Sequence, residues 1–383
     1  MDFNFQWLLV ALPVAFALGW LASRLDLREW KRSEQTSPKA YYKGLNLLLN
    51  EQHDKAIDAF IEAVQEDPDT SDLHFALGNL FRRRGEFERA VRVHEHLLHR
   101  ADLPRTERDR AQHALAQDFM KAGLFDRAEA AYRALEGTAF DTEARLALLM
   151  LHERSRDWRA AVEVAQKLES RGTGSFASRI SHYWCEIALE ADARHQTDEA
   201  DMALQHARDA APQAARPLVL AGERAARRRD HAEVLQLWGV LMVTHPAAFN
   251  LVARDYALAA LATGAQAEAL ERLSALYERA PTMELLDALT ALDPDPQIRR
   301  TRLLGQLRSH PTLSVARALI TQSESARFDP AETQALGEAI GSAAKPLHRY
   351  RCAACGFEAH HYFWQCPGCS NWDSYPPRRL EDL

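Results

Sequence analysis

Four of the five cysteines form two close pairs near the C-terminal end of this 383-residue chain. Each pair has the spacing C-x-x-C, and ten residues separate the two pairs. Two thiolates at this spacing can bind one metal ion, and four thiolates are a ligand set of tetrahedral zinc and iron sites. Two histidines between the pairs, His360 and His361, are not needed as ligands. The sequence therefore predicts one tetrahedral metal ion bound by Cys352, Cys355, Cys366 and Cys369.

The segment around these cysteines is too short to build a core of its own, so a metal cross-link is the expected source of its stability. Proline and small residues over 341–352 ("GSAAKPLHRYRC") mark a boundary before it. We predict a metal-binding domain over residues 344–383. Thiolate ligation alone does not decide between iron and zinc, or between an electron carrier, a catalyst and a structural clamp. Aromatic residues are dense in this domain, namely Tyr350, Phe357, Tyr362, Phe363, Trp364, Trp372 and Tyr375.

A repeat of about thirty-four residues organises the chain before this domain. Small residues at fixed positions let two helices approach closely, and large apolar residues fill the gap to the next pair. The pattern weakens along the chain, giving about seven recognisable repeats followed by degenerate helical sequence. The spacing resembles the tetratricopeptide repeat and predicts a mainly α superhelical solenoid over residues 38–343. Residues in the first three copies that should pack these helices are Gly44, Ala56, Phe60, Gly78, Ala90, Gly123, Ala128 and Tyr132.

No catalytic constellation stands out within the repeats, and an enzyme is not expected. The stretch "HEHLLH" lacks the second histidine of an H-E-x-x-H zinc site, because that position is Leu98. His94 instead occupies a repeat position that is usually aromatic, which favours packing. The fifth cysteine, Cys185, lies in an apolar-periodic run and is expected to pack as a small hydrophobic residue.

The N-terminal residues have the features of a membrane anchor. Residues 3–22 contain no charge, and about twenty apolar residues span a bilayer core as a helix. Trp7 and Trp20 lie near its two ends, where aromatic rings prefer the interface. Pro13 and Gly19 are tolerated inside membrane helices.

A retained anchor is favoured over an interfacial helix and over a cleaved signal peptide. No basic residue precedes the apolar stretch, and basic residues follow it. The positive-inside rule then places the N-terminus outside and the rest of the chain in the cytoplasm. We predict a single-pass transmembrane helix over residues 1–23 and a basic juxtamembrane linker over residues 24–37.

The net charge of −7 argues against a general nucleic-acid-binding protein. Basic runs occur at residues 82–84 and 227–229, but acidic residues lie beside both. These runs are therefore expected on solvated helix faces.

The order of these parts and several local strings resemble one known family. The strings "LPVAFALGW", "GLNLLLNEQHDKAIDAFIEAVQED", "LGNLFRRRGEFERAVRVHEHLL" and "RYRCAACGF…WQCPGCSNW" look like lipopolysaccharide assembly protein B of Gram-negative bacteria, and the resemblance covers essentially the whole chain. "CAACGF" and "CPGC" also resemble the two knuckles of rubredoxins and zinc ribbons. The ten-residue interval is much shorter than in electron-carrying rubredoxins.

The resemblance implies an inner-membrane regulator of lipopolysaccharide synthesis, with a periplasmic N-terminus and cytoplasmic repeats and metal domain. Family members work with the membrane-bound AAA+ protease to bring about degradation of the deacetylase that commits precursor to lipid A. A lipopolysaccharide-sensing inner-membrane protein restrains them, and contact with other lipopolysaccharide assembly proteins has been proposed. By the same resemblance, the four cysteines correspond to an iron-type rubredoxin site.

The leading interpretation is a membrane-tethered adaptor whose metal domain docks on the solenoid and whose ribbon aromatics contact partners. The alternative is a rubredoxin-like redox protein that delivers electrons to a partner enzyme. The sequence leaves open which solenoid face binds which partner, how many degenerate repeats follow the seventh, and whether the chain forms homo-oligomers.

Overall fold

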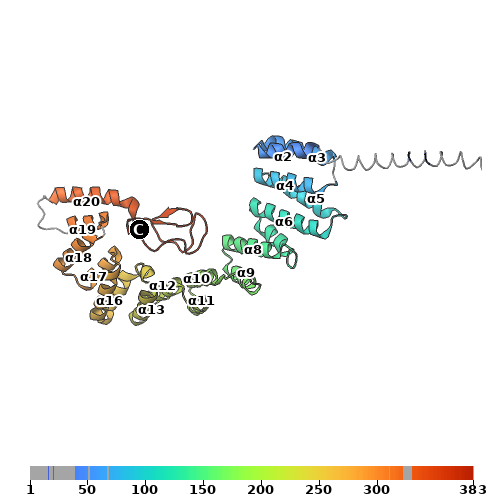
Figure 1. The fold of residues 1–383 in the computed structure, drawn as a ribbon. Helices are drawn as coiled ribbons and strands as arrows, with labels where there is room; N and C mark the ends of the chain where they lie inside the picture. The colour runs from blue at the N-terminus through green and yellow to red at the C-terminus, as the bar shows by residue number, and fades with distance from the viewer. Residues whose placement is uncertain are drawn as a thin grey trace, which may run out of the picture. The chain divides into compact units, whose positions relative to one another are not determined.

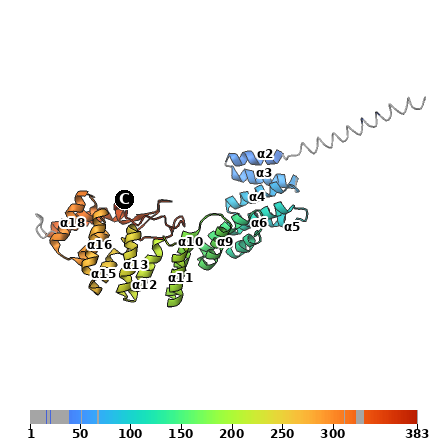
Figure 2. The same cartoon turned by 60° about the horizontal axis from the view of Figure 1, so that its bottom comes forward.

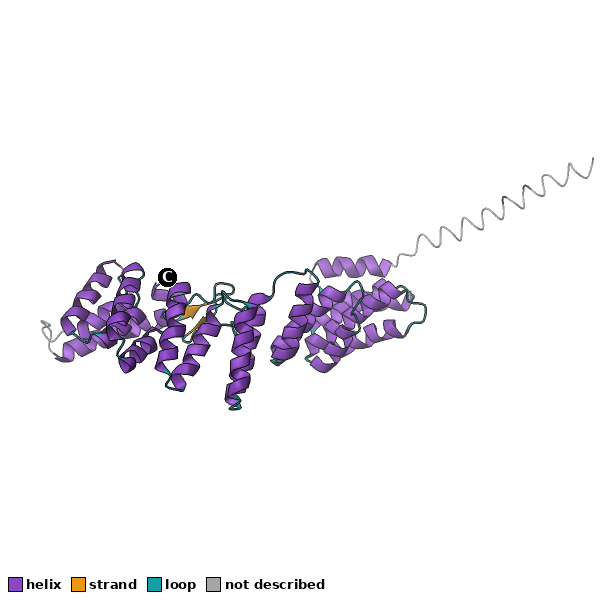
Figure 3. Ribbon diagram, turned by 90° about the horizontal axis from the view of Figure 1, so that it is seen from below, coloured by secondary structure: helices purple, strands orange, loops and turns teal. Residues whose placement is uncertain are grey.

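The computed structural model describes residues 39–50, 52–66, 69–309, 311–321 and 330–382, together with Phe16 and Trp20. The chain forms two compact units, of which the first ends at Arg154 and the second begins at Ser155. Helices make up most of the described part of each unit, and the two short strands lie near the C-terminus (Figure 3). The predicted mainly helical fold is confirmed.

The first unit is built from helix pairs joined by short turns (Figure 1). Consecutive helices from α2 to α7 pack side by side. In chain order the helices are α2 (Lys39–Leu49), α3 (His53–Glu66), α4 (Ser71–Arg84), α5 (Phe87–His99), α6 (Arg105–Ala122), α7 (Phe125–Arg133) and α8 (Asp141–Ser155).

The second unit continues the pattern of paired helices, and Figure 2 shows α11, α12 and α13 side by side. The final pairs, from α17 onward, correspond to the degenerate part of the predicted array. The helices are α9 (Trp158–Ser170), α10 (Ala177–Ala193), α11 (Thr197–Ala210), α12 (Ala215–Arg227), α13 (His231–Thr244), α14 (Pro246–Phe249), α15 (Ala253–Thr263), α16 (Gln266–Arg279), α17 (Met283–Leu292), α18 (Pro296–Ser309), α19 (Leu313–Thr321) and α20 (Pro330–Ala344).

Small residues on the first helix of a pair lie against large side chains on the second. A Cβ atom at Gly44 would lie 2.8 Å from the Phe60 ring, and one at Gly78 would lie 2.5 Å from Nε2 of His94. A Cβ atom cannot lie that close to another side-chain atom. The absence of a Cβ atom at these two glycines therefore permits the observed helix spacing. Four more of the predicted packing residues are also buried, namely Ala56, Ala90, Ala128 and Tyr132.

The turn inside five of the helix pairs and the connection from α8 to α9 each contain one residue in the left-handed backbone region. Gly85, Gly123 and Gly264 occupy this position with φ of 82°, 76° and 74°. Glycine adopts this conformation without steric cost, which explains why it ends the first helix of these pairs. Three other turns place a larger residue there, at a cost of about 1–3 kcal/mol each. These residues are Arg156, His195 and Arg229, with φ of 58°, 60° and 60°.

The expectation that residues 82–84 lie on a solvated face is wrong for Arg82. Its guanidinium donates to Oδ1 of Asp118 at 2.7 Å and to the Ala114 carbonyl at 3.1 Å. The other oxygen of Asp118 lies 2.5 Å from Nδ1 of His94, and both of these side chains are fully buried. A carboxylate is tolerated inside a protein only with such partners. A buried polar network therefore joins α4, α5 and α6, and His94 packs inside the unit as expected.

The predicted anchor at residues 1–23 and linker at residues 24–37 lie outside the described residues, except for Phe16 and Trp20, which are exposed. Trp7, Pro13 and Gly19 are among the residues that are not described. Within the described part of the chain, no helix is both long enough and apolar enough to cross a membrane. The anchor stays a prediction.

Candidate metal centre

Two similar turns carry the four cysteines. In the first, the Gly356 N–H donates to the Cys352 carbonyl at 2.9 Å, and in the second the Ser370 N–H donates to the Cys366 carbonyl at 2.8 Å. Gly356 and Ser370 both have positive φ, of 77° and 58°. A left-handed residue after each C-x-x-C pair turns the chain back sharply. The two turns thus have the same backbone design, although only the first uses glycine.

The sulfur positions test whether these residues fit a metal ion. All four Sγ atoms lie within 4.8 Å of one another. The Sγ distance from Cys352 to Cys369 is 3.8 Å, and that from Cys355 to Cys366 is 3.7 Å. Four sulfurs placed tetrahedrally about 2.3 Å from a zinc ion lie about 3.8 Å apart. The predicted four-cysteine metal site is therefore confirmed, and this ligand set suits iron as well as zinc.

The surroundings of the thiols also favour a bound cation. Burial raises the pKa of Cys352, but hydrogen bonds from the Ser374 side chain and the Cys355 backbone outweigh it and lower that pKa to about 6. A backbone hydrogen bond from Phe357 lowers the pKa of Cys355, but desolvation and hydrogen bonds shared with the other thiols raise it to about 12. The first thiolate therefore forms readily, whereas the last forms only against the charge of the others. A metal cation compensates this charge and lets all four ionise.

The site is closed on one side and open on the other. Cys352 and Cys366 are buried, Cys369 is half-buried and Cys355 is exposed. The Gly368 N–H donates to the Cys366 sulfur at 3.3 Å. The open corner of the site is therefore the Cys355 sulfur.

The ribbon that holds the site has a very small core. Strands β1 (Tyr350–Arg351) and β2 (Glu358–Ala359) form an antiparallel pair. Tyr350 and Tyr375 are the large side chains buried beside the two inner cysteines. The Tyr375 hydroxyl donates to the Phe357 carbonyl at 3.2 Å. A core of this size cannot stabilise a fold by itself, so the ribbon relies on further contacts.

One such contact is a stack of aromatic rings on the helices of the second unit. The Trp372 ring stacks on His182 of α10, with centroids 4.6 Å apart and planes 15° apart. Trp372 also makes edge contacts with Trp158 of α9 and Tyr183 of α10, at 6.2 and 6.0 Å between centroids. Figure 1 shows the ribbon segment next to α10 and α12. These rings dock the metal-binding ribbon on the helix pairs.

The neighbouring residue, Asp373, adds a polar contact to the same docking surface. Its Oδ2 lies 2.8 Å from Nε2 of His182 and accepts a hydrogen bond from the Ser178 hydroxyl at 2.8 Å. Burial raises the pKa of Asp373, but the hydrogen bonds from His182 and Ser178 and the charge of Arg216 outweigh it and lower that pKa. Asp373 therefore docks as a carboxylate.

Arg216 of α12 is also part of this docking surface and lies near two tryptophan rings of the ribbon. Its guanidinium lies 5.6 Å from the Trp372 ring centroid and 5.9 Å from that of Trp364. It is almost fully buried and forms an ion pair with Glu186 at 2.6 Å. Trp364 packs against the apolar core of the second unit.

The chain after the ribbon also returns to the helices. Short 3-10 turns η1 (Lys345–His348) and η2 (Leu380–Asp382) flank the ribbon. Glu381 accepts hydrogen bonds from the Ser314 backbone and hydroxyl at the start of α19, and it lies 3.3 Å from Nε2 of His348. Arg379 forms an ion pair with Glu284 of α17 at 3.2 Å. This C-terminal tail holds the ribbon to α17 and α19.

The structure assigns different roles to the ribbon's aromatic residues. Trp364 and Trp372 contact helices of their own chain, whereas Phe357 and Phe363 are exposed. Trp364 and Trp372 are half-buried by these contacts, and contact of the ribbon's aromatics with partners stays a prediction. The sequence did not reveal the residues that receive the two tryptophans, although polar residues on the apolar face of a predicted helix are a usable signal. These receiving residues are Ser178, His182 and Arg216.

The fold and the site define a helical-repeat protein with a C-terminal four-cysteine metal-binding ribbon. A family model described as a rubredoxin metal binding domain matches residues 350–376. The chain is 31% identical to lipopolysaccharide assembly protein B of Escherichia coli strain K12, and the match covers 97% of this chain and 98% of that protein. The chain belongs to the lipopolysaccharide assembly protein B family.

A second relative and a solved structure complete these comparisons. The protein of the same name from Haemophilus influenzae is 27% identical, with 97% of each chain covered. The crystal structure of YrrB, described as a TPR protein with an unusual peptide-binding site, is 16% identical and covers 51% of this chain and 96% of that chain. Its TM-score is 0.34, which is low. The repeat architecture of this chain therefore rests on its own helix pairs.

Proposed function

We propose that this protein acts in lipopolysaccharide assembly as an inner-membrane-anchored cytoplasmic adaptor. The observation that carries the proposal is the 31% identity to the Escherichia coli protein over 97% of the chain, which includes both the helix pairs and the ribbon. The relatives are named for lipopolysaccharide assembly. In this proposal the N-terminus lies in the periplasm, and the repeats and metal site lie in the cytoplasm.

The step that the adaptor regulates is proteolysis of the deacetylase that commits precursor to lipid A. The membrane AAA+ protease is the proposed partner, and the deacetylase is the proposed client. Stacked helix pairs present an extended surface that suits binding of other proteins. A membrane anchor also raises the effective concentration of partners in the same bilayer, so each contact can be weak. A lipopolysaccharide-sensing inner-membrane protein would restrain the adaptor.

The metal has a structural role in this proposal, and the chain itself performs no catalysis. When bound, iron or zinc supplies a cross-link between the two cysteine turns. The ribbon's own contacts with α10, α12, α17 and α19 support this role, because they make the ribbon part of the helical surface. The redox alternative is not favoured, since the relatives are named for assembly.

The test is the turnover of the deacetylase in cells. A variant lacking residues 1–22 should fail to promote turnover, because the adaptor leaves the bilayer. A second variant, in which an unrelated single transmembrane helix replaces residues 1–22, should restore it if tethering alone is needed. The measurement is the half-life of the deacetylase after protein synthesis is blocked.

Two outcomes of this experiment would reject parts of the proposal. Normal turnover with the untethered variant, at equal protein level, would reject the tether. An unchanged deacetylase half-life in cells that lack this protein altogether would reject the regulatory role itself.

A further inference from the structure

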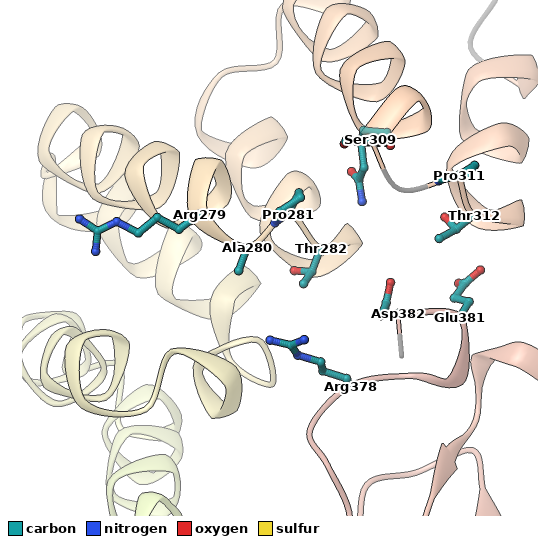
Figure 4. A pocket seen from close by; sticks show the side chains of 11 residues that line it. Arg279, Ala280, Pro281, Thr282, Ser309, Pro311, Thr312, Arg378, Glu381 and Asp382 are labelled. Carbon is teal, nitrogen blue, oxygen red and sulfur yellow. Dashed lines mark hydrogen bonds between the residues drawn. The ribbon is translucent and has the colours of Figure 1, made fainter.

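A pocket of about 440 Å³, whose lining includes none of the four metal-binding cysteines, lies in the second unit (Figure 4). This volume falls within the range of small-molecule sites, about 300–1,000 Å³. One wall is the turn from α16 to α17, residues 279–282. A second wall is formed by Gln306 and Ser309 of α18 with Pro311 and Thr312 before α19, and the third is the C-terminal tail. The pocket is therefore built from three separate parts of the chain.

The second wall carries the side-chain amide of Gln306, whose donor group has no hydrogen bond to a described residue. Gln306 is only 3% exposed, and its amide oxygen accepts a hydrogen bond from the Tyr277 hydroxyl at 2.9 Å. Its NH₂ group has no acceptor in the described part of the chain, and the residue lines the pocket. This amide is therefore available to a ligand that accepts hydrogen bonds.

The tail contributes a positive charge. Figure 4 shows Arg378 reaching toward the turn that carries Thr282. The neighbouring Arg379 is paired with Glu284, but Arg378 has no ion pair with any described residue. Hydroxyl groups of Ser309 and Thr312 also line the pocket.

The acceptors in the pocket are largely taken. The side chain of Glu381 is 5% exposed, and its oxygens are occupied by Ser314 and His348. Asp382 has no hydrogen bond or ion pair with a described side chain. Burial and the nearby charges of Glu284 and Glu381 raise the pKa of Asp382 to about 6. The side-chain N–H donors of the lining without a hydrogen bond to a described residue are therefore those of Arg378 and Gln306 together with Arg279, and the Asp382 carboxyl can itself carry a proton.

We propose that this pocket binds the oxyanion group of a small metabolite, either a phosphate or sulfate group or a carboxylate. Arg378 provides the charge-assisted hydrogen bonds, and the Gln306 amide provides a second donor from the opposite wall. Charge-assisted hydrogen bonds to an oxyanion are stronger than neutral ones. The proposal is independent of the proposed adaptor role.

The test is a calorimetric titration of the full-length protein in detergent at pH 5.5 and constant ionic strength. Sodium sulfate stands in for a phosphate or sulfate group, and sodium acetate stands in for a carboxylate. We expect saturable binding of at least one probe, and the tighter one identifies the class. Arg378→Gln should weaken that binding by about tenfold or more. Gln306→Leu should weaken it several-fold.

The matched control is Arg308→Gln, which removes an exposed arginine from the same helix as Gln306 but outside the pocket. It should leave binding unchanged. Arg378 is exposed, so the Arg378→Gln variant is expected to fold. It therefore tests the proposal even if the Gln306→Leu variant fails to fold. Absence of saturable binding of both probes, or equal binding by the Arg378 variant, would overturn the proposal. So would tight binding of Mg²⁺ or Ca²⁺ in place of the anions.

The affinity for sulfate, measured at several pH values, tests whether Asp382 faces the bound anion. The charged groups around Asp382 are Glu284, Glu381, Arg279, Arg378, Arg379 and His348. Sulfate keeps its charge between pH 7.5 and 5.5, whereas Asp382 gains a proton over this range and loses its repulsion. Sulfate should therefore bind more tightly at pH 5.5, and Asp382→Asn should remove most of this change. If the variant keeps the full pH dependence, Asp382 does not face the bound anion.

Discussion

The helix pairs bury large side chains such as Phe60 and Trp238 inside the chain's own core, whereas the ribbon buries little more than two tyrosines beside two cysteines. The helix pairs obtain their stability from small residues set against large ones, as at Gly44 and Phe60. The ribbon obtains its stability from four metal ligands and from contacts with α10, α12, α17 and α19. The ribbon should therefore depend on the metal and the helices much more than the helices depend on it.

The largest expected effect is loss of the metal site. Cys352→Ser combined with Cys366→Ser removes the two buried ligands, and structural zinc sites contribute on the order of 10 kcal/mol. We expect no bound metal and rapid tryptic cleavage within residues 350–382, while far-UV circular dichroism stays helical. His360→Ala combined with His361→Ala is the control and should keep the metal. Full metal content in the double serine variant would contradict the four-cysteine site.

The next effect concerns the helix pairs instead of the ribbon. Phe60→Ala should destabilise the first unit by about 3–5 kcal/mol, because the side chain is 1% exposed. Urea unfolding followed by circular dichroism measures this loss, and metal content should not change. Leu49→Ala, at a position that is 83% exposed, is the control and should have little effect. Metal loss in the Phe60 variant would show that the ribbon and the first unit are coupled.

A smaller effect concerns the docking surface. Trp372→Ala removes the ring stacked on His182 and should weaken docking by about 1–3 kcal/mol without loss of metal. Limited proteolysis of the ribbon reports this weakening, and Phe363→Ala, at an exposed ring, is the matched control. Unchanged protease resistance would show that the ring stack does not hold the ribbon.

The pH dependence of docking follows from Asp373. Its folded pKa is lowered below the usual 3.8, so its contribution is present above that pH and is lost only as the pH falls through the lower folded value. Docking should therefore be constant from pH 7 to pH 5 and weaken only in stronger acid. Asp373→Asn should remove this contribution at every pH, and weakening of wild-type docking near pH 6 would contradict the assignment.

The smallest effect lies in the turns of the helix pairs. His195 adopts φ of 60°, a conformation that glycine adopts without steric cost. His195→Gly should raise the free energy of unfolding by about 1 kcal/mol, because the conformational freedom that glycine loses on folding offsets part of the relieved strain. Gly85→Ala should lower it by about 1 kcal/mol. Thermal unfolding measures both, and destabilisation by His195→Gly would point to a contact of the imidazole.

The sequence predicted the features that depend on local spacing. The cysteine pairs, the paired helices and the buried positions at Ala56 and Phe60 follow from short-range patterns. The docking of Asp373 on His182 could not be predicted in this way, because 191 residues separate the two. The same reason applies to Arg82, whose burial depends on Asp118 in a later repeat. Polar contacts between distant segments depend on how the repeats pack, which composition and periodicity do not specify.

The most direct test of the central claim is hydrogen exchange of the full-length protein, with and without its metal. The claim is that the metal holds a ribbon that forms part of the helical surface. Removal of the metal should speed exchange in residues 350–382 and on the ribbon-facing part of α10, and leave exchange in residues 39–154 unchanged. Unchanged exchange in α10, with the ribbon alone affected, would contradict the claim.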